Sequence, residues 1–329
     1  MPSVSIIVPC YNEEATIQLL LESICRQTYS IAELEVILAD GMSTDRTRLK
    51  VAVFQEANPD LKVKIVDNPK RIIPAALNAA LGAAQGEIVI RLDGHSMPYP
   101  DYVEHCVADL QSGRGDNVGG VWEIRPGNET WLANSIAVAA SHPLGVGNAQ
   151  YRLASRAGVV DTVPFGSFRR QLFERIGRFD ETLLTNEDYE FNSRIRKQGG
   201  TIWLDPAIRS VYFARSGLSE LARQYWRYGF WKSQMLRRYP ETLRWRQALP
   251  PLFVLGLLGL GFLAIFWWSA RIILVTGLLI YFLCLWLGSL RAVFSHKDIR
   301  LSLGVPLAIV TMHVSWGAGF LWSLVKQSA

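Results

Sequence analysis

Residues Ile73–His95, IPAALNAALGAAQGEIVIRLDGH, contain the pattern that decides the fold. The first part, up to about Ala84, favours a helix, and the run Glu87–Leu92 (EIVIRL) reads as a buried strand. The strand is followed at once by Asp93-Gly94-His95, a polar turn. A helix that leads into a strand with a polar end is the repeating unit of a parallel sheet.

The same alternation runs through the residues before this stretch. Two helices are predicted, from Asn12 to about Gln27 and from about Thr44 onward. Three further strand-like runs accompany them, at Ser3–Pro9, Leu34–Ala39 and Val63–Val66. Strands that alternate with helices predict an α/β domain, Rossmann-like, with a mainly parallel sheet and helices on both faces.

Polar side chains follow three of these strands. The first is followed by Pro9-Cys10-Tyr11-Asn12-Glu13, the second by Asp40-Gly41, and the fourth by Asp93-Gly94-His95. Ligands of parallel sheets bind beyond the carboxyl ends of the strands. Each residue alone also suits an ordinary turn or cap, but their coincidence at three strand ends favours one site.

A divalent metal is the natural partner of that site. The sequence has no GxGxxG after the first strand and no GxxxxGK[ST], which argues against dinucleotide oxidoreductases and P-loop ATPases. A bound nucleotide diphosphate would then need another source of positive charge. Asp93 and His95 are the candidate ligands, for Mn²⁺ or Mg²⁺, with the histidine favouring Mn²⁺. The alternative is that His95 is a loop histidine bonded to the backbone.

Three apolar stretches at the C-terminal end predict membrane spans: Pro250–Trp268, Ile272–Leu290 and Leu301–Val325. Each has about the 20 residues that a helix needs to cross hydrocarbon. The alternative is a set of buried helices in a soluble protein.

Charge placement predicts the orientation of these spans. Basic residues stand before the first span and between the second and third, at Arg237, Arg238, Arg244, Arg246, Arg291, Lys297 and Arg300, together with His296. The other two junctions carry only Arg271 and Lys326. By the positive-inside rule, the N-terminal domain faces the cytoplasm and the C-terminus lies outside, in a multi-pass protein of the inner (plasma) membrane.

The net charge of +5 is also explained by a membrane rather than by nucleic acid. The basic residues concentrate between Arg209 and Arg246, directly before the first span, where anionic lipid head groups lie. The four cysteines are scattered without a CxxC pair, which indicates neither a disulfide framework nor a zinc site.

Several motifs resemble glycosyltransferase family 2. They are PCYNEE (9–14), ADGMSTD (39–45), the stretch AALNAALGAAQGEIVIRLDGH (75–95) and Asn186-Glu187-Asp188, in a match that covers nearly all of Ser3–Pro240. Later segments, such as GVGNAQYR (145–152) and QYWRYGFWK (224–232), resemble the enzymes that extend lipid-linked saccharides of succinoglycan-type exopolysaccharides.

We expect three regions. The resemblance implies a GT-A catalytic domain over residues 1–215. The basic, amphipathic pattern predicts interfacial helices over 216–248, and hydrophobic length predicts a transmembrane region of about three helices over 249–329. Its motifs also imply roles in binding a nucleotide-sugar. The positions around the base and ribose are Pro9, Tyr11, Glu13 and Asp40, with Asp40 accepting a hydrogen bond from the base.

The same resemblance implies the catalytic residues. Asp93 and His95 fall on the family's DxD motif, which binds ribose, diphosphate and metal; His95 replaces its last aspartate. Glu187 and Asp188 match the family's ED pair, in which the aspartate is the general base. The alternative is that these two acids only begin a helix, whose first turn acids suit.

Two further motifs are implied near the donor diphosphate and the acceptor. Gln224, Arg227 and Tyr228 resemble the family's QxxRW motif, with Tyr228 in place of tryptophan, and share one face of a predicted helix. The alternative is an amphipathic helix in the head-group region. Gly166 and Ser167 resemble the segment that lines the donor sugar and acceptor.

The resemblance therefore implies an inverting, metal-dependent transfer of a sugar to a polyprenyl-diphosphate-linked saccharide in exopolysaccharide biosynthesis. The expected donor is a UDP-sugar, with a hexose such as glucose. The alternatives are a polyprenyl-phosphate sugar synthase, a processive polysaccharide synthase and an inactive membrane scaffold.

Overall fold

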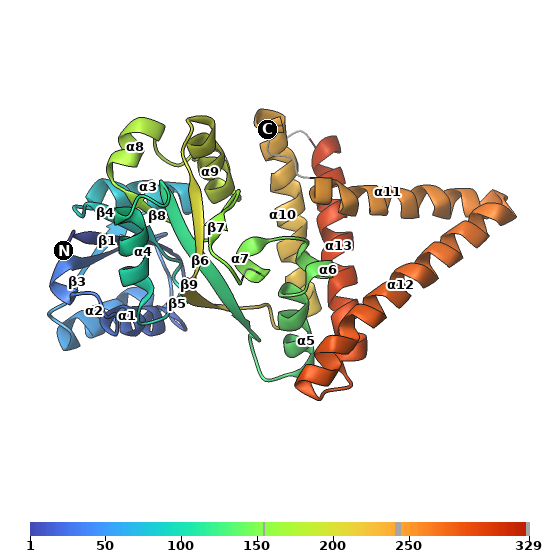
Figure 1. Cartoon of the computed structure of the whole chain (residues 1–329), viewed down its shortest axis with the longest axis horizontal. Helices are drawn as coiled ribbons and strands as arrows, with labels where there is room; N and C mark the ends of the chain where they lie inside the picture. The colour runs from blue at the N-terminus through green and yellow to red at the C-terminus, as the bar shows by residue number, and fades with distance from the viewer. Residues whose placement is uncertain (154, 241–244, 327–329) are drawn as a thin grey trace. The chain divides into compact units, whose positions relative to one another are not determined.

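The computed structural model describes residues 1–153, 155–240 and 245–326 (Figure 1). Its contacts divide the chain into two compact units. The first, which we call the sheet unit, comprises Met1–Glu123 and Gln150–Tyr212. The second, the helical unit, comprises Ile124–Ala149 and Phe213–Ala329.

One half of the sheet is parallel, as the sequence predicts. Its strands are ordered β3 (Lys62–Asp67), β2 (Leu34–Asp40), β1 (Val4–Cys10) and β4 (Ile88–Arg91). Cys10 pairs with Asp40, and Asp40 with Asp67, so these strands end at the same edge. The connecting elements are α1 (Ile17–Cys25), η1 (Ile31–Glu33), α2 (Thr47–Ala57) and α3 (Ile73–Ala83).

The other half of the sheet makes it a mixed sheet, which alternation in the first hundred residues does not predict. Strand β8 (Ser167–Arg169) pairs antiparallel with both β4 and β6 (Asn117–Arg125). Beyond β6 lie β9 (Ile202–Phe213) and β5 (Met97–Pro98), and β7 (Gly158–Val159) pairs with β9. The helices between these strands are α4 (Tyr102–Gln111), α7 (Gln150–Leu153), α8 (Gln171–Ile176) and α9 (Glu187–Lys197).

The sheet separates two apolar cores. Alternate residues of β1 point to opposite faces, so Ile6 and Val8 pack in one core and Ile7 in the other. The second core contains Phe191 of α9, whose ring lies 5.3 Å from that of Phe173 and 4.8 Å from that of Phe179, centre to centre. This aromatic cluster fixes α9, and with it the position of the acids in its first turn.

The helical unit contains the C-terminal helices and one segment from the middle of the chain. Its elements are α5 (Trp131–Ala140), α6 (Pro143–Val146), α10 (Leu218–Arg238), α11 (Trp245–Phe266), α12 (Trp268–His296) and α13 (Leu301–Val325). Among the described residues, Gln247–Phe266, Trp268–His296 and Leu301–Val325 are long and apolar enough to cross a membrane. Arg244, one of the basic residues from which the orientation of the spans is predicted, lies outside the described residues.

The compact units do not follow the sequence-based boundaries throughout. Ile124–Ala149 lies inside the predicted catalytic domain of residues 1–215, yet it packs with the C-terminal helices. The reason is local: α5 is apolar, and a Cβ atom added to Gly304 of α13 would lie 2.1 Å from the hydroxyl oxygen of Ser135. The close approach needs a glycine at position 304.

Candidate active site

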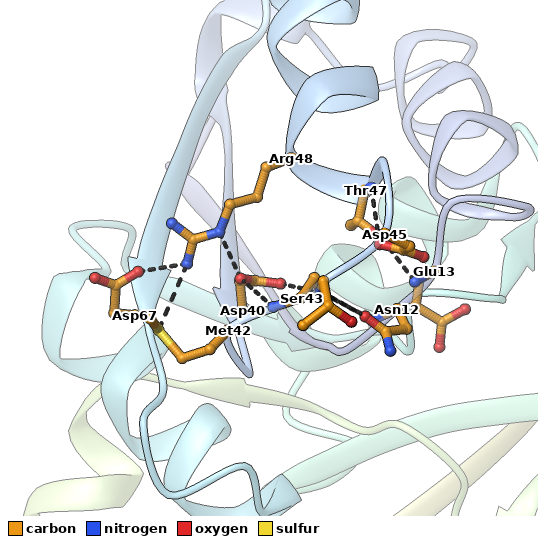
Figure 2. A network of polar contacts seen from close by, with 10 residues as sticks. Asn12, Glu13, Asp40, Met42, Ser43, Asp45, Thr47, Arg48 and Asp67 are labelled. Atoms are coloured by element: carbon orange, nitrogen blue, oxygen red, sulfur yellow. Dashed lines mark hydrogen bonds and ion pairs between the residues drawn. The ribbon is translucent and has the colours of Figure 1, made fainter.

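A network of hydrogen bonds joins the loops that follow β1 and β2 (Figure 2). The Asn12 amide donates to Ser43 Oγ at 2.8 Å, and the Thr44 amide donates to Asn12 Oδ1 at 2.9 Å. The Glu13 amide donates to Thr47 Oγ1 at 2.8 Å. Asn12 has a φ of 54°, in the left-handed region that asparagine tolerates better than most residues. The two loops therefore form one rigid rim at the strand ends.

Asp40 stabilises the two loops of this rim, which follow β1 and β2, through hydrogen bonds. Its carboxylate is only 2% exposed and accepts hydrogen bonds from the Ser43 amide at 3.0 Å and from Arg48 Nε at 2.6 Å (Figure 2). Arg48 also pairs with Asp67 at 2.5 Å, so one guanidinium joins the ends of β2 and β3. Contact between Asp40 and a nucleotide base stays a prediction.

Tyr11 stands exposed on the rim. Its side chain lies directly over Gly41, where an added Cβ would come within 3.1 Å of the ring, and the guanidinium of Arg71 lies 5.8 Å from the ring centre. Pro9 is half-buried at the end of β1, opposite Ala39. An exposed aromatic ring above a glycine is a surface on which a planar base can stack.

Glu13 and His95 connect this rim to the end of β4. His95 Nδ1 lies 3.0 Å from Glu13 Oε1, and a Cβ atom at Gly94 would come within 2.9 Å of Glu13 Cγ. The side chains of Asp93 and His95 are partly exposed, so a metal ion could reach both of them. Among the described residues, no three or more acidic, histidine or cysteine side chains are arranged so that they could hold a metal ion together. Two protein ligands fit a metal whose coordination is completed by substrate phosphates.

Arg91 is a residue of the candidate site that the sequence did not predict. It is the last residue of β4 and is buried, yet its Nη2 atom lies 2.8 Å from Glu187 Oε1 and 3.3 Å from Asp93 Oδ1. Burial opposes the charged form, but the charges of Asp93, Glu187 and Asp188 prevail and raise the pKa of Arg91 above its ordinary value. One cation thus joins the predicted metal motif to the predicted catalytic pair. An arginine among apolar strand residues was the available signal.

Glu187 and Asp188 occupy the first turn of α9, but in different surroundings. Glu187 is buried, and burial raises its pKa to about 7, against the opposing effect of Arg91. Asp188 is half-buried, and its Oδ1 atom accepts a hydrogen bond from the Tyr189 amide at 2.7 Å. Of the two predicted catalytic acids, Asp188 is therefore the one that an acceptor can reach.

The segment around Gly166 touches Arg91 through the backbone. The Gly166 carbonyl accepts a hydrogen bond from the Arg91 amide at 3.0 Å, and a Cβ at Gly166 would lie 2.7 Å from Asn117 Oδ1. Phe165 and Gly166 both have positive φ, 64° and 83°. Because a bulky residue rarely adopts this conformation, the turn is strained. Ser167 is fully buried in β8, so it supports the turn from inside the sheet unit.

The third predicted motif lies in the helical unit. Gln224, Arg227 and Tyr228 are on α10, where Gln224 Nε2 donates to the Tyr228 hydroxyl at 3.0 Å. The rings of Tyr225 and Tyr228 meet edge to face, with centres 5.7 Å apart. The shared face that the spacing predicts is therefore present. The role of this motif at a diphosphate stays a prediction.

Comparison with solved structures identifies the class of the fold. A mannosyltransferase from Pyrobaculum calidifontis, PcManGT, solved in complex with GDP-Man and Mn²⁺, aligns over 98% of this chain and 87% of its own with a TM-score of 0.66. At 22% sequence identity this likeness concerns the fold, which is of the GT-A class.

The sequence comparisons then give the family. Residues 5–177 match the family model for glycosyl transferase family 2, and the chain belongs to this family. The succinoglycan biosynthesis protein ExoA of Rhizobium meliloti (strain 1021) is 31% identical over 96% of this chain and 93% of its own length.

A second relative comes from Methanococcus voltae. It is named dolichyl N-acetyl-alpha-D-glucosaminyl phosphate 3-beta-D-2,3-diacetamido-2,3-dideoxy-beta-D-glucuronosyltransferase and is 28% identical over 100% of this chain and 99% of its own length. The family expected from the sequence motifs is confirmed.

We expect Arg91→Met to destabilise the protein by about 3–5 kcal/mol, because it leaves the buried carboxylate of Glu187 without its cation. Thermal or chemical unfolding in detergent measures the effect. The control is Arg175→Met, which removes the more exposed ion pair with Asp116 and should cost about 0–1 kcal/mol. Adding Glu187→Gln to Arg91→Met should restore part of the loss. Equal costs for the two single variants would contradict the role assigned to Arg91.

Proposed function

We propose that the protein is an inverting, metal-dependent glycosyltransferase that moves a sugar from a nucleotide-sugar to a lipid-linked saccharide. The observation that carries the proposal is the Arg91 bridge, which joins Glu187 at 2.8 Å and Asp93 at 3.3 Å. Through it, the first turn of α9, with Asp188, is held in fixed relation to the candidate metal ligands. A base and a leaving-group site must be positioned together for an inverting transfer.

The transfer itself needs one base and one stabilised leaving group. The Asp188 carboxylate accepts the proton of an acceptor hydroxyl while that oxygen attacks the anomeric carbon of the donor sugar. A new glycosidic bond forms as the bond from the anomeric carbon to the phosphate oxygen breaks. The electron pair of the broken bond leaves with the nucleoside diphosphate. Attack opposite the leaving group inverts the anomeric centre.

Asp93 and His95 are the residues that would hold the metal, Mn²⁺ or Mg²⁺. When bound, the ion supplies positive charge that stabilises the departing diphosphate. Glu13, at 3.0 Å from His95 Nδ1, orients the imidazole. Tyr11 offers a stacking surface for the base, and Gln224, Arg227 and Tyr228 are proposed to act near the diphosphate and acceptor.

We further propose a UDP-hexose as donor and a polyprenyl-diphosphate-linked saccharide as acceptor, in exopolysaccharide assembly. The similarity to a succinoglycan biosynthesis protein and to a transferase named for a dolichyl-linked sugar phosphate supports a lipid-linked saccharide acceptor. The basic residues that precede α11 support a catalytic unit on the cytoplasmic face of the plasma membrane.

We expect Asp188→Asn to lower the rate of sugar transfer by about 10²–10⁴-fold, because the amide cannot accept the hydroxyl proton. The measurement is transfer of radiolabelled sugar by the purified protein in detergent. Asp60→Asn, an exposed change between α2 and β3, is the matched control and should transfer at the unaltered rate. An Asp188→Asn variant as active as this control would remove Asp188 from the mechanism.

His95→Ala should weaken Mn²⁺-dependent donor binding by at least about tenfold, since even outer-shell partners of a metal contribute about 10–100-fold to affinity. Thermal protection by nucleotide-sugars, titrated with Mn²⁺, measures this change. Because the His95 side chain is 44% exposed, the unfolding midpoint without nucleotide should stay the same. The control is His105→Ala on α4, a comparably exposed histidine. Equal metal dependence in both variants would exclude His95 as a ligand.

The choice of donor and acceptor is tested by a panel. UDP- and GDP-sugars are each supplied with polyprenyl phosphate or with a polyprenyl-diphosphate-linked saccharide. We expect product only with a UDP-hexose and the saccharide acceptor. Product only from the simple phosphate would identify a polyprenyl-phosphate sugar synthase instead, and polymer formed from nucleotide-sugar alone would identify a processive synthase.

A further inference from the structure

Helices α10 and α13 of the helical unit touch at the backbone. A Cβ atom added to Gly229 of α10 would lie 2.0 Å from the carbonyl oxygen of Trp316, and one added to Gly319 of α13 would lie 2.3 Å from that of Trp226. Neither position has room for a side chain. The two helices therefore form one tightly packed pair.

The pair runs in the same direction, side by side in Figure 1. Near its end, α10 reaches the end of α13: Gln234 Nε2 donates to Ser323 Oγ at 2.8 Å, and Arg237 Nη2 donates to the Ser323 carbonyl at 2.5 Å. Gly317 lies against the carbonyl of Pro250, at the beginning of α11. The last turns of α13 thus lie beside the beginning of the first candidate span.

Helix α10 is too highly charged to cross a membrane. Its 21 residues include five cationic side chains, four of which are exposed: Arg223, Arg227, Arg237 and Arg238, with Lys232 buried. Charges in a lipid-facing helix are strongly disfavoured at the bilayer centre. A helix that packs along α10 in the same direction stays with it at the membrane surface.

Helices α11 and α12 have different surroundings from those of α13. Of the residues in the most apolar stretch of each helix, 44% are buried by protein in α13, against 11% in α11 and in α12. Gly256 and Gly259 of α11 and Gly277 of α12 meet no neighbouring atom. In Figure 1, α11 leaves α13 sideways and α12 returns to it obliquely, as a separate hairpin.

We propose that only the α11–α12 hairpin crosses the bilayer. Helix α13 instead lies beside α10 in the membrane interface, on the same side of the bilayer as the end of α10. The C-terminal end of α13 is then on the same side as α10. This proposal differs from the sequence-based prediction of three spans with the C-terminus outside.

The α10–α13 pair is proposed to bind an anionic lipid bilayer. Helix α13 exposes apolar side chains along its length, namely Leu303, Leu307, Val314 and Trp322, which suit the boundary between head groups and acyl chains. The exposed arginines of α10 suit anionic head groups. At the far end of the hairpin, Trp267 and Trp268 are exposed, as residues of the opposite interface are.

The experiment compares three variants in sealed vesicles by labelling with a membrane-impermeant maleimide. Each variant carries one added cysteine besides the four native ones, and the unsubstituted chain gives the background from the native thiols. Ser269→Cys marks the junction of α11 and α12, Ser295→Cys the end of α12, and Lys326→Cys the end of α13; all three positions are exposed. We expect Lys326→Cys to be labelled from the same side as Ser295→Cys. Labelling from the same side as Ser269→Cys would overturn the proposal.

Reporter fusions at the C-terminus of the full chain give an independent measurement that needs no accessible thiol. We expect a green fluorescent protein fusion to fluoresce and an alkaline phosphatase fusion to be inactive, as for a cytoplasmic C-terminus. An active phosphatase with a dark fluorescent fusion would overturn the proposal. Neither experiment measures sugar transfer, and the labelling compares positions within one chain, so failure here is distinct from failure of the proposed activity.

Discussion

The candidate site depends on one buried cation. Asp93 follows a strand and Glu187 begins a helix far along the chain, and the side chain of Arg91 contacts both. Removing one partner of a buried ion pair usually costs about 3–5 kcal/mol, because the remaining charge is left without compensation. The cost acts on geometry as well as on stability: β4 and α9 cannot drift apart without exposing that charge. The proposed metal ligands and the proposed base are thus held by the same interaction that stabilises the sheet unit.

The sequence predicts the parts of this site whose signals are local. Runs of β-branched residues that stop at polar ones predict strand ends at Pro9, Ala39 and Leu92. The observed ends, Cys10, Asp40 and Arg91, each lie within one residue of these positions. The family motifs indicate Asp93, His95 and Asp188. The Arg91 bridge was not predicted, because it needs the antiparallel half of the sheet. Strand β8 lies between β4 and β6, and the first turn of α9 lies against Arg91 only in the folded chain. No spacing in the sequence encodes that approach.

The helical unit shows the same limit for membrane helices. Hydropathy describes the composition of a helix but not its surroundings. By length and apolarity, α13 could cross a membrane as well as α11 and α12 could. The glycines of α13 show what surrounds this helix. Gly304, Gly317 and Gly319 each face a neighbouring segment at a distance that excludes a side chain, whereas Gly256 and Gly277 face nothing. The glycines of α13 therefore indicate that this apolar helix packs against protein along part of its surface, where a lipid-facing helix would not.

The energy of charge burial decides between the two topologies of α13. Were α13 to span the bilayer, α10 would have to accompany it, carrying five cationic residues at about 2.5–3.5 kcal/mol each near the bilayer centre. Arg237 and Arg238, at the end of α10, could lower this cost by extending their charged groups to the head-group region. Arg223, Arg227 and Lys232 lie within the helix and would still carry the cost. Separating the helices instead would open the backbone contacts at Gly229 and Gly319. Keeping the pair in the interface avoids both costs, since head groups solvate the arginines while the apolar face of α13 reaches the acyl chains.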